Sequence, residues 1–160
     1  MMTERSPGVS TTAEVRPAGP NDIEALVVMC GEHARYEGAP YRRAGKAKAL
    51  SRALFAATPR LHGWVAEAAG EVTGYATAAW EFSTWQGGEF LHMDCLFVRE
   101  GWRGHGTGAA LLQAVGDFAR RSGCAEIQWQ TPEWNGDAAR FYRRAGAVEK
   151  SKRRFFLALA

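Results

Sequence analysis

The chain has 160 residues, of which 46% are hydrophobic, and a formal net charge of +3. This length suits one domain with a core of its own, and so mild a charge disfavours a nucleic-acid-binding protein. The three cysteines form no CxxC pair, so no metal site is predicted. Without a long apolar run, we expect no signal peptide and no membrane contact, and therefore a reduced cytoplasmic location.

The first part of the chain predicts a tail, a strand and two helices. Residues 1–12 are rich in Ser, Thr, Gly and Pro and are expected to be disordered, which leaves 13–160 as the domain. A short strand is expected at 14–16. Apolar residues at helical spacing predict one helix from Pro20 to about Tyr36 and a second over about 44–57.

The rest of the chain alternates strands and helices, which is typical of a mixed α/β domain. The expected elements are strands at 61–68, 72–82 and 89–98, a helix ending near 121, a strand at 126–130, a helix between Asn135 and Gly146, and a terminal pair of strands at 148–159.

A glycine-rich turn after the third of these strands predicts an anion site. The apolar run Leu96–Val98 ends in a basic turn, and Gly104, Gly106 and Gly108 then lead directly into a helix. The first N–H groups of a helix have no partner inside it, and the helix dipole adds partial positive charge. Glycines let a phosphate approach the backbone, so we expect a bound pyrophosphate.

Two common phosphate-binding motifs fit this turn poorly. A Walker A loop needs a Lys after the glycines, and none is present. The Rossmann fingerprint fits Gly104, Gly106 and Ala109 literally, but the next predicted strand ends in Gln130 and Thr131 rather than in an acidic residue.

A third motif, Arg/Gln-x-x-Gly-x-Gly/Ala, is met by Arg103, Gly106 and Gly108, and a second block runs from Glu133-Trp134-Asn135 to Gly146-Ala147. Together these resemble the two signature motifs of the GCN5-related N-acetyltransferases. The resemblance implies an enzyme that uses acetyl-CoA as acetyl donor, and a GNAT-like fold with a mixed sheet of about six to seven strands and four helices. It also implies cofactor contacts at Leu96, Phe97, Val98, Arg103, Gly104, His105, Gly106, Thr107, Gly108, Ala109, Asn135 and Tyr142.

Acetyl transfer to an amine needs a proton acceptor for the amine and a donor for the departing thiolate. By the resemblance Tyr142 is the expected acid, although it could instead only pack against the cofactor. Asp94 is the expected base, because an unpaired carboxylate inside an apolar strand is costly to bury. It could take the amine proton through water or bind the cationic amine, and a hydrogen-bonded structural Asp is an open alternative. Strand alternation would place His92, a second candidate, on the same face as Asp94, Leu96 and Val98.

Within this superfamily the pattern is most similar to the diamine (spermidine/spermine) N-acetyltransferases, on the residues Tyr36-Glu37, Trp85, Asp94 and Glu133-Trp134-Asn135. Asp94 stands where that subfamily has a glutamate that serves the acceptor amine, which puts polyamine specificity in question. The subfamily implies a homodimer. A polycationic acceptor would need an acidic cleft, which the following residues could line: Glu32, Glu37, Glu81, Glu89 and Asp94.

The expected reaction is direct transfer to a primary amine of a small molecule, because no cysteine occupies an evident nucleophile position. A polyamine is one candidate acceptor. A lysine-like amino acid, a protein N-terminus or an aminoglycoside are alternatives, and a non-catalytic acyl-CoA sensor is an alternative of a different class.

Overall fold

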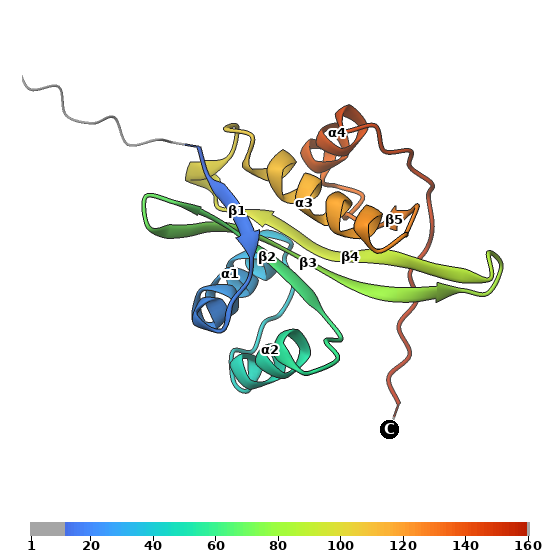
Figure 1. Cartoon of the computed structure of the whole chain (residues 1–160). Coiled ribbons are helices and arrows are strands. Elements are labelled where there is room, and N and C mark those ends of the chain that lie inside the picture. The colour runs from blue at the N-terminus through green and yellow to red at the C-terminus, as the bar shows by residue number, and fades with distance from the viewer. Residues whose placement is uncertain (1–11, 160) are drawn as a thin grey trace, which may run out of the picture. The chain divides into compact units, whose positions relative to one another are not determined.

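A computed structural model describes residues 12–159, so the predicted tail at 1–12 lies almost wholly outside the described residues. The chain divides into two compact units, one ending at Gln130 and the other beginning at Thr131. Together the described residues form four α-helices and one mixed sheet, which confirms the α/β fold (Figure 1).

The first unit contains the whole sheet, in the order β1-β2-β3-β4-β5. Neighbouring strands are antiparallel except for β4 and β5, which are parallel. A β3–β4 hairpin forms the centre, because both strands are long and rich in apolar and aromatic residues. The strands are β1 (Glu14–Pro17), β2 (His62–Ala68), β3 (Glu71–Ser83), β4 (Gly88–Val98) and β5 (Ile127–Gln128).

Helices cover both faces of this sheet: α1 (Ile23–Tyr36) and α2 (Lys46–Phe55) lie on one face and α3 (Thr107–Arg121) on the other (Figure 1). Buried side chains of α1 pack against Tyr75 of β3 and Phe97 of β4. On the α3 side, Gly74 lets β3 approach its neighbours closely, since a Cβ there would lie 2.9 Å from the Phe97 carbonyl oxygen. Both layers therefore hold β4 firmly in place.

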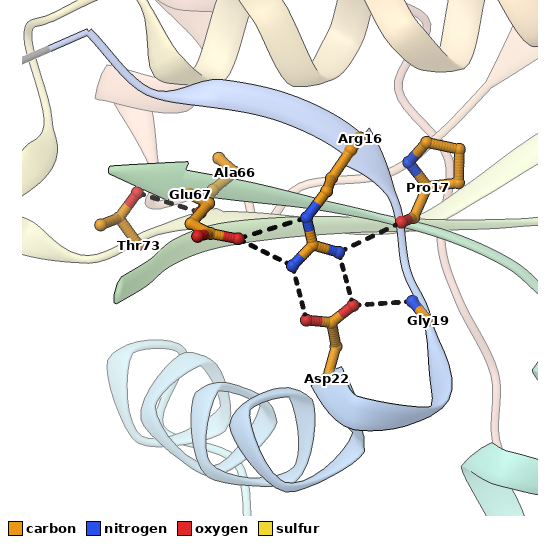
Figure 2. Close-up of polar contacts among 7 residues, drawn as sticks. All are labelled: Arg16, Pro17, Gly19, Asp22, Ala66, Glu67 and Thr73. Atoms are coloured by element: carbon orange, nitrogen blue, oxygen red, sulfur yellow. Dashed lines mark hydrogen bonds and ion pairs between the residues drawn. The ribbon is translucent and has the colours of Figure 1, made fainter. Parts of the chain in front are cut away.

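Arg16 joins β1, the start of α1 and β2 (Figure 2). Its guanidinium donates to both carboxylate oxygens of Asp22 at 2.7 and 2.9 Å, and to Glu67 at 2.8 Å. The Gly19 amide also donates to Asp22. The hydrogen bonds from Arg16 lower the pKa of the buried Asp22 carboxyl, so this carboxylate stays charged at neutral pH.

The second unit contains α4 (Gly136–Arg144), as predicted, but the strands expected at 148–159 are not formed. The described sheet therefore has five strands, not six to seven, and β5 is shorter than the predicted 126–130. A strand needs a neighbour for its backbone groups. Within the described part of the second unit, residues 148–159 have no strand beside them, and Phe155 is 86% exposed.

No helix among residues 12–159 is long and apolar enough to cross a membrane. Nor do the described residues include a group of His, Cys, Asp and Glu side chains that could hold a metal ion.

Candidate active site

The turn before α3 forms an open backbone cradle. Gly104 and Gly106 have φ of 77° and 81°, the left-handed region that favours glycine, and a Cβ at either would meet nothing within 4 Å. Gly106 is the N-cap of α3 and offers no side-chain cap. The first amides of the helix, at Thr107, Gly108 and Ala109, therefore point into this open space without a partner in the described chain. Such a cradle fits an anion.

Thr107 gives an independent sign that a polar group belongs in the cradle. The residue is only 3% exposed, and its Oγ1 is the one buried side-chain oxygen or nitrogen of the described residues without a hydrogen-bond partner. A buried hydroxyl without a partner costs about 1–3 kcal/mol. A phosphate oxygen at the start of α3 would satisfy this hydroxyl, so the loop fits the pyrophosphate of coenzyme A.

The positive charge of Arg103 suggests that it binds the pyrophosphate, but its side chain contacts other parts of the protein. Its Nε donates to the Val98 carbonyl oxygen at 2.8 Å, and its guanidinium lies over the rings of Tyr36, at 4.7 Å, and Phe97, at 5.6 Å. The guanidinium therefore stacks between α1 and β4. A direct contact between this side chain and the pyrophosphate stays a prediction.

One edge of β4 is open beside the cradle. Strand β5 pairs with Leu91 and His92 only, so within the described part of the first unit the segment from Met93 to Val98 has a strand neighbour on its β3 side alone. An extended ligand can add to such an edge through main-chain hydrogen bonds. This is where the sequence predicted the backbone contacts of Leu96 and Val98 with the cofactor.

A β-bulge at Asp94 corrects the predicted face of the strand. Thr77 pairs with Cys95 and Ala78 with Met93, so Asp94 has no partner on β3. His92 and Leu96 consequently lie on opposite faces, because a bulge shifts the alternation by one residue. The prediction that positions 92, 94, 96 and 98 share a face is wrong, since strand pairing cannot be read from one strand alone.

The Asp94 side chain is exposed, so the argument from burial of a carboxylate does not apply. Its Oδ2 lies 3.7 Å from the Cys95 thiol. Burial, together with the charge of Asp94, raises the pKa of Cys95 to about 12, and burial likewise raises the pKa of Cys30 on α1. Asp94 is thus an accessible carboxylate beside two thiols that stay protonated at neutral pH.

A cavity of about 390 Å³ lies between α1 and the end of β4, on the face that Cys95 and Phe97 share. It combines cationic, acidic and aromatic side chains. Glu32, Arg35 and Tyr36 have the spacing of one helix face, which the sequence shows. The sequence does not show which residues of β4 this face meets, so the cavity was not predicted. The lining residues are Glu32, Arg35, Tyr36, Phe97, Arg99, Glu100 and Arg103.

Three of the five acids that could line an acidic cleft have partners instead. Glu32 forms a two-point ion pair with Arg99, at 2.9 and 3.1 Å. Glu37 lies 3.2 Å from His33 Nε2, and Glu81 lies 2.9 Å from His92 Nδ1. The second base candidate, His92, is thus held by Glu81.

In the second unit, Asn135 caps α4, because its Oδ1 accepts a hydrogen bond from the Ala138 amide at 3.2 Å. The helix carries Tyr142 next to Phe141, with ring centroids 5.1 Å apart. The capping interpretation of Asn135 is therefore confirmed, and its contact with the cofactor stays a prediction.

Residues 29–147 match the sequence model of the acetyltransferase (GNAT) family. The chain belongs to the GNAT acetyltransferase family. This acetyltransferase is 29% identical over 143 residues to a thialysine N-epsilon-acetyltransferase of Bos taurus, with 84% of each chain covered. It is 27% identical over 139 residues to that of Caenorhabditis elegans, covering 87% of this chain and 85% of the relative.

Solved structures show the same fold. An aminoglycoside acetyltransferase from an uncultured soil metagenomic sample superposes with a TM-score of 0.80 at 17% identity, over 94% of this chain and 99% of that one. The acetyltransferase is therefore an N-acetyltransferase with a GNAT fold that acts on an amine and uses acetyl-CoA as donor.

Proposed function

We propose that this acetyltransferase moves the acetyl group of acetyl-CoA to the side-chain amine of a lysine-like amino acid. Two relatives that match this chain over most of their length are named as thialysine N-epsilon-acetyltransferases, and thialysine is a lysine analogue. Their names support a lysine-like acceptor. The charge pattern carries the choice against a polyamine. Glu32 is neutralised by Arg99, and Arg35 and Arg103 line the same cavity, so a polycation there would meet two further positive charges.

In this proposal the backbone of the α3 cradle holds the pyrophosphate, with the Thr107 hydroxyl donating to it. The open edge of β4 aligns the pantetheine arm. Asp94, exposed at the bulge, takes the proton of the acceptor ammonium so that the neutral amine can attack the thioester carbon. Tyr142 donates its hydroxyl proton to the sulfur as the carbon–sulfur bond breaks, and the proton that the nitrogen loses on becoming an amide restores the Tyr142 hydroxyl.

We infer direct transfer rather than a covalent acetyl-enzyme. A nucleophilic cysteine needs a lowered pKa, whereas burial raises the pKa of both Cys30 and Cys95, the cysteines near Asp94. Varying both substrates in initial-rate experiments should give intersecting double-reciprocal lines. Parallel lines, the pattern of a two-stage exchange, would contradict direct transfer.

The acceptor is tested by incubating the protein with acetyl-CoA and thialysine, lysine, ornithine, spermidine, an aminoglycoside or a peptide. Free coenzyme A and the mass of each acceptor are measured. Thialysine or lysine should give the highest kcat/KM. A higher value for spermidine would identify a polyamine acetyltransferase, and coenzyme A binding without any turnover would support a sensor.

We also propose a homodimer, as the resemblance implies. The apolar side chains of the C-terminal segment support it, because Val148, Phe155 and Phe156 are exposed. One chain has a mass of 17.5 kDa. Light scattering at micromolar concentration should give twice this mass. The mass of one chain would refute the dimer.

A further inference from the structure

We propose that the cavity between α1 and the end of β4 is a recognition site for the amino-acid head group of the acceptor, in which Arg35 and Arg103 bind the α-carboxylate. This inference rests on the proposed function, because a lysine-like acceptor carries an α-carboxylate and an α-ammonium that a simple diamine or polyamine lacks.

The cavity lies on the correct face of the sheet. Phe97, which lines it, and Cys95 both face α1, and the Asp94 carboxylate lies beside the Cys95 thiol. Asp94 and the cavity therefore belong to the same side of β4. An acceptor whose terminal amine meets Asp94 can extend along this face toward the cavity.

The length of a lysine-like chain matches this separation. Phe97 follows Asp94 by three residues, which corresponds to about 10 Å along a strand. The chain between the terminal amine and the Cα atom of lysine or thialysine spans roughly 6 Å, given single bonds of about 1.5 Å. The carboxylate and a hydrogen bond of about 3 Å cover the rest.

The cavity's three arginines differ in how far their donors are already used. All three guanidinium nitrogens of Arg99 donate, to Glu32, Glu71 and the Val72 carbonyl oxygen, so Arg99 links α1 to the sheet.

Arg103 uses only its Nε, toward Val98, and stacking on Tyr36 and Phe97 orients the rest of its guanidinium. Its two Nη atoms and the whole exposed Arg35 guanidinium have no hydrogen-bond partner within residues 12–159. A pre-oriented guanidinium with both Nη atoms available is suited to a carboxylate.

The acids of the cavity are arranged to match a zwitterion. Glu32 is neutralised by Arg99, whereas Glu100 is exposed and has no ion pair among the described residues. Glu100 can therefore accept hydrogen bonds from the α-ammonium while Arg35 and Arg103 hold the carboxylate. A ligand with only positive charges would place one of them beside these two guanidinium groups, which is unfavourable.

The test compares thialysine with its carboxamide, which has nearly the same size but no negative charge. The readout is the ratio of the two kcat/KM values, which is insensitive to losses in folding or in coenzyme A binding. The wild type should favour thialysine by about tenfold or more, the scale of one charge-assisted hydrogen bond. Arg35→Met and Arg103→Gln should each bring the ratio close to one; Gln is also a residue that the family motif accepts at position 103.

Arg42→Met is the matched control, because Arg42 is an exposed arginine outside the cavity. It should leave the ratio unchanged. Glu100→Gln should raise the KM for thialysine. It should leave the KM unchanged for a second thialysine analogue, one that lacks the α-amine. If thialysine is acetylated but Arg35→Met and Arg103→Gln keep the wild-type ratio, the head-group site is refuted while the proposed function stands.

Equilibrium binding separates the two proposals when no amine is acetylated. Calorimetry with the coenzyme A-saturated protein should show thialysine binding about tenfold more tightly than its carboxamide. Equal affinities would overturn the head-group site. A tenfold preference in a protein that acetylates neither compound would support the site and refute the proposed acceptor.

Discussion

Replacing Gly106 by Ala tests whether the turn before α3 binds coenzyme A, because the substitution strains the backbone of this turn. At φ of 81° an L-residue pays about 1–2 kcal/mol for the left-handed conformation. Beyond the two neighbouring residues the added Cβ meets no atom within 4 Å, so this cost includes no clash with the rest of the described chain. If the backbone relaxes, the Thr107 amide, the first of the helix, turns away from the anion. We therefore expect a loss of about 1–2 kcal/mol in unfolding free energy, and an increase of about tenfold in the Kd of coenzyme A, which corresponds to about 1.4 kcal/mol.

The assay is calorimetric titration with coenzyme A, paired with urea denaturation of the free protein. Gly101→Ala is the matched control, because Gly101 lies in the same loop, meets nothing within 4 Å and lacks a left-handed φ. Gly101→Ala should bind coenzyme A as the wild type does. Wild-type affinity in Gly106→Ala would refute the assignment of these amides to the pyrophosphate.

Three further predictions concern packing, pH and the acid. Gly74→Ala should destabilise the fold by about 1–3 kcal/mol in urea, because its Cβ would lie 2.9 Å from the Phe97 carbonyl oxygen; Gly88→Ala, with open space, should cost far less, and equal losses would contradict the close-packing argument. Arg16 lowers the pKa of Asp22 below the ordinary 3.8, so the stability it provides is complete above that pH and is lost as the pH falls through the lowered value. Asp22→Asn should therefore cost about 2 kcal/mol at neutral pH and much less at about pH 2, and a pH-independent difference would refute the linkage. Tyr142→Phe should lower kcat by about 100-fold without weakening acetyl-CoA binding, and an unchanged kcat would remove Tyr142 from the acid role.

Local sequence signals predicted most of the fold. Helical spacing gave α1 and α3 within a few residues, and the glycines at 104 and 106 are left-handed where an anion loop needs them. The terminal strands at 148–159 were wrong, because a strand exists only through its neighbour, and the run Phe155–Leu159 has the composition of a strand without a described partner.

The site was predicted less completely, for a physical reason. The bulge at Asp94 depends on how β4 pairs with β3, and one strand's sequence does not contain that register. The direction of the Arg103 side chain likewise depends on Tyr36, which is distant in sequence. Loop chemistry could be predicted from adjacent residues, whereas the cavity and the ion pairs of Glu32 and Glu81 arise from contacts between separate elements.

The most direct test of the central claim is to locate the acetyl group on thialysine after incubation with acetyl-CoA, using proton–carbon NMR with a carbon-13-labelled acetyl donor. We expect one product, acetylated on the side-chain nitrogen, with one coenzyme A released per acetyl transferred. Acetylation on the α-nitrogen, or none on thialysine while another amine is acetylated, would contradict it.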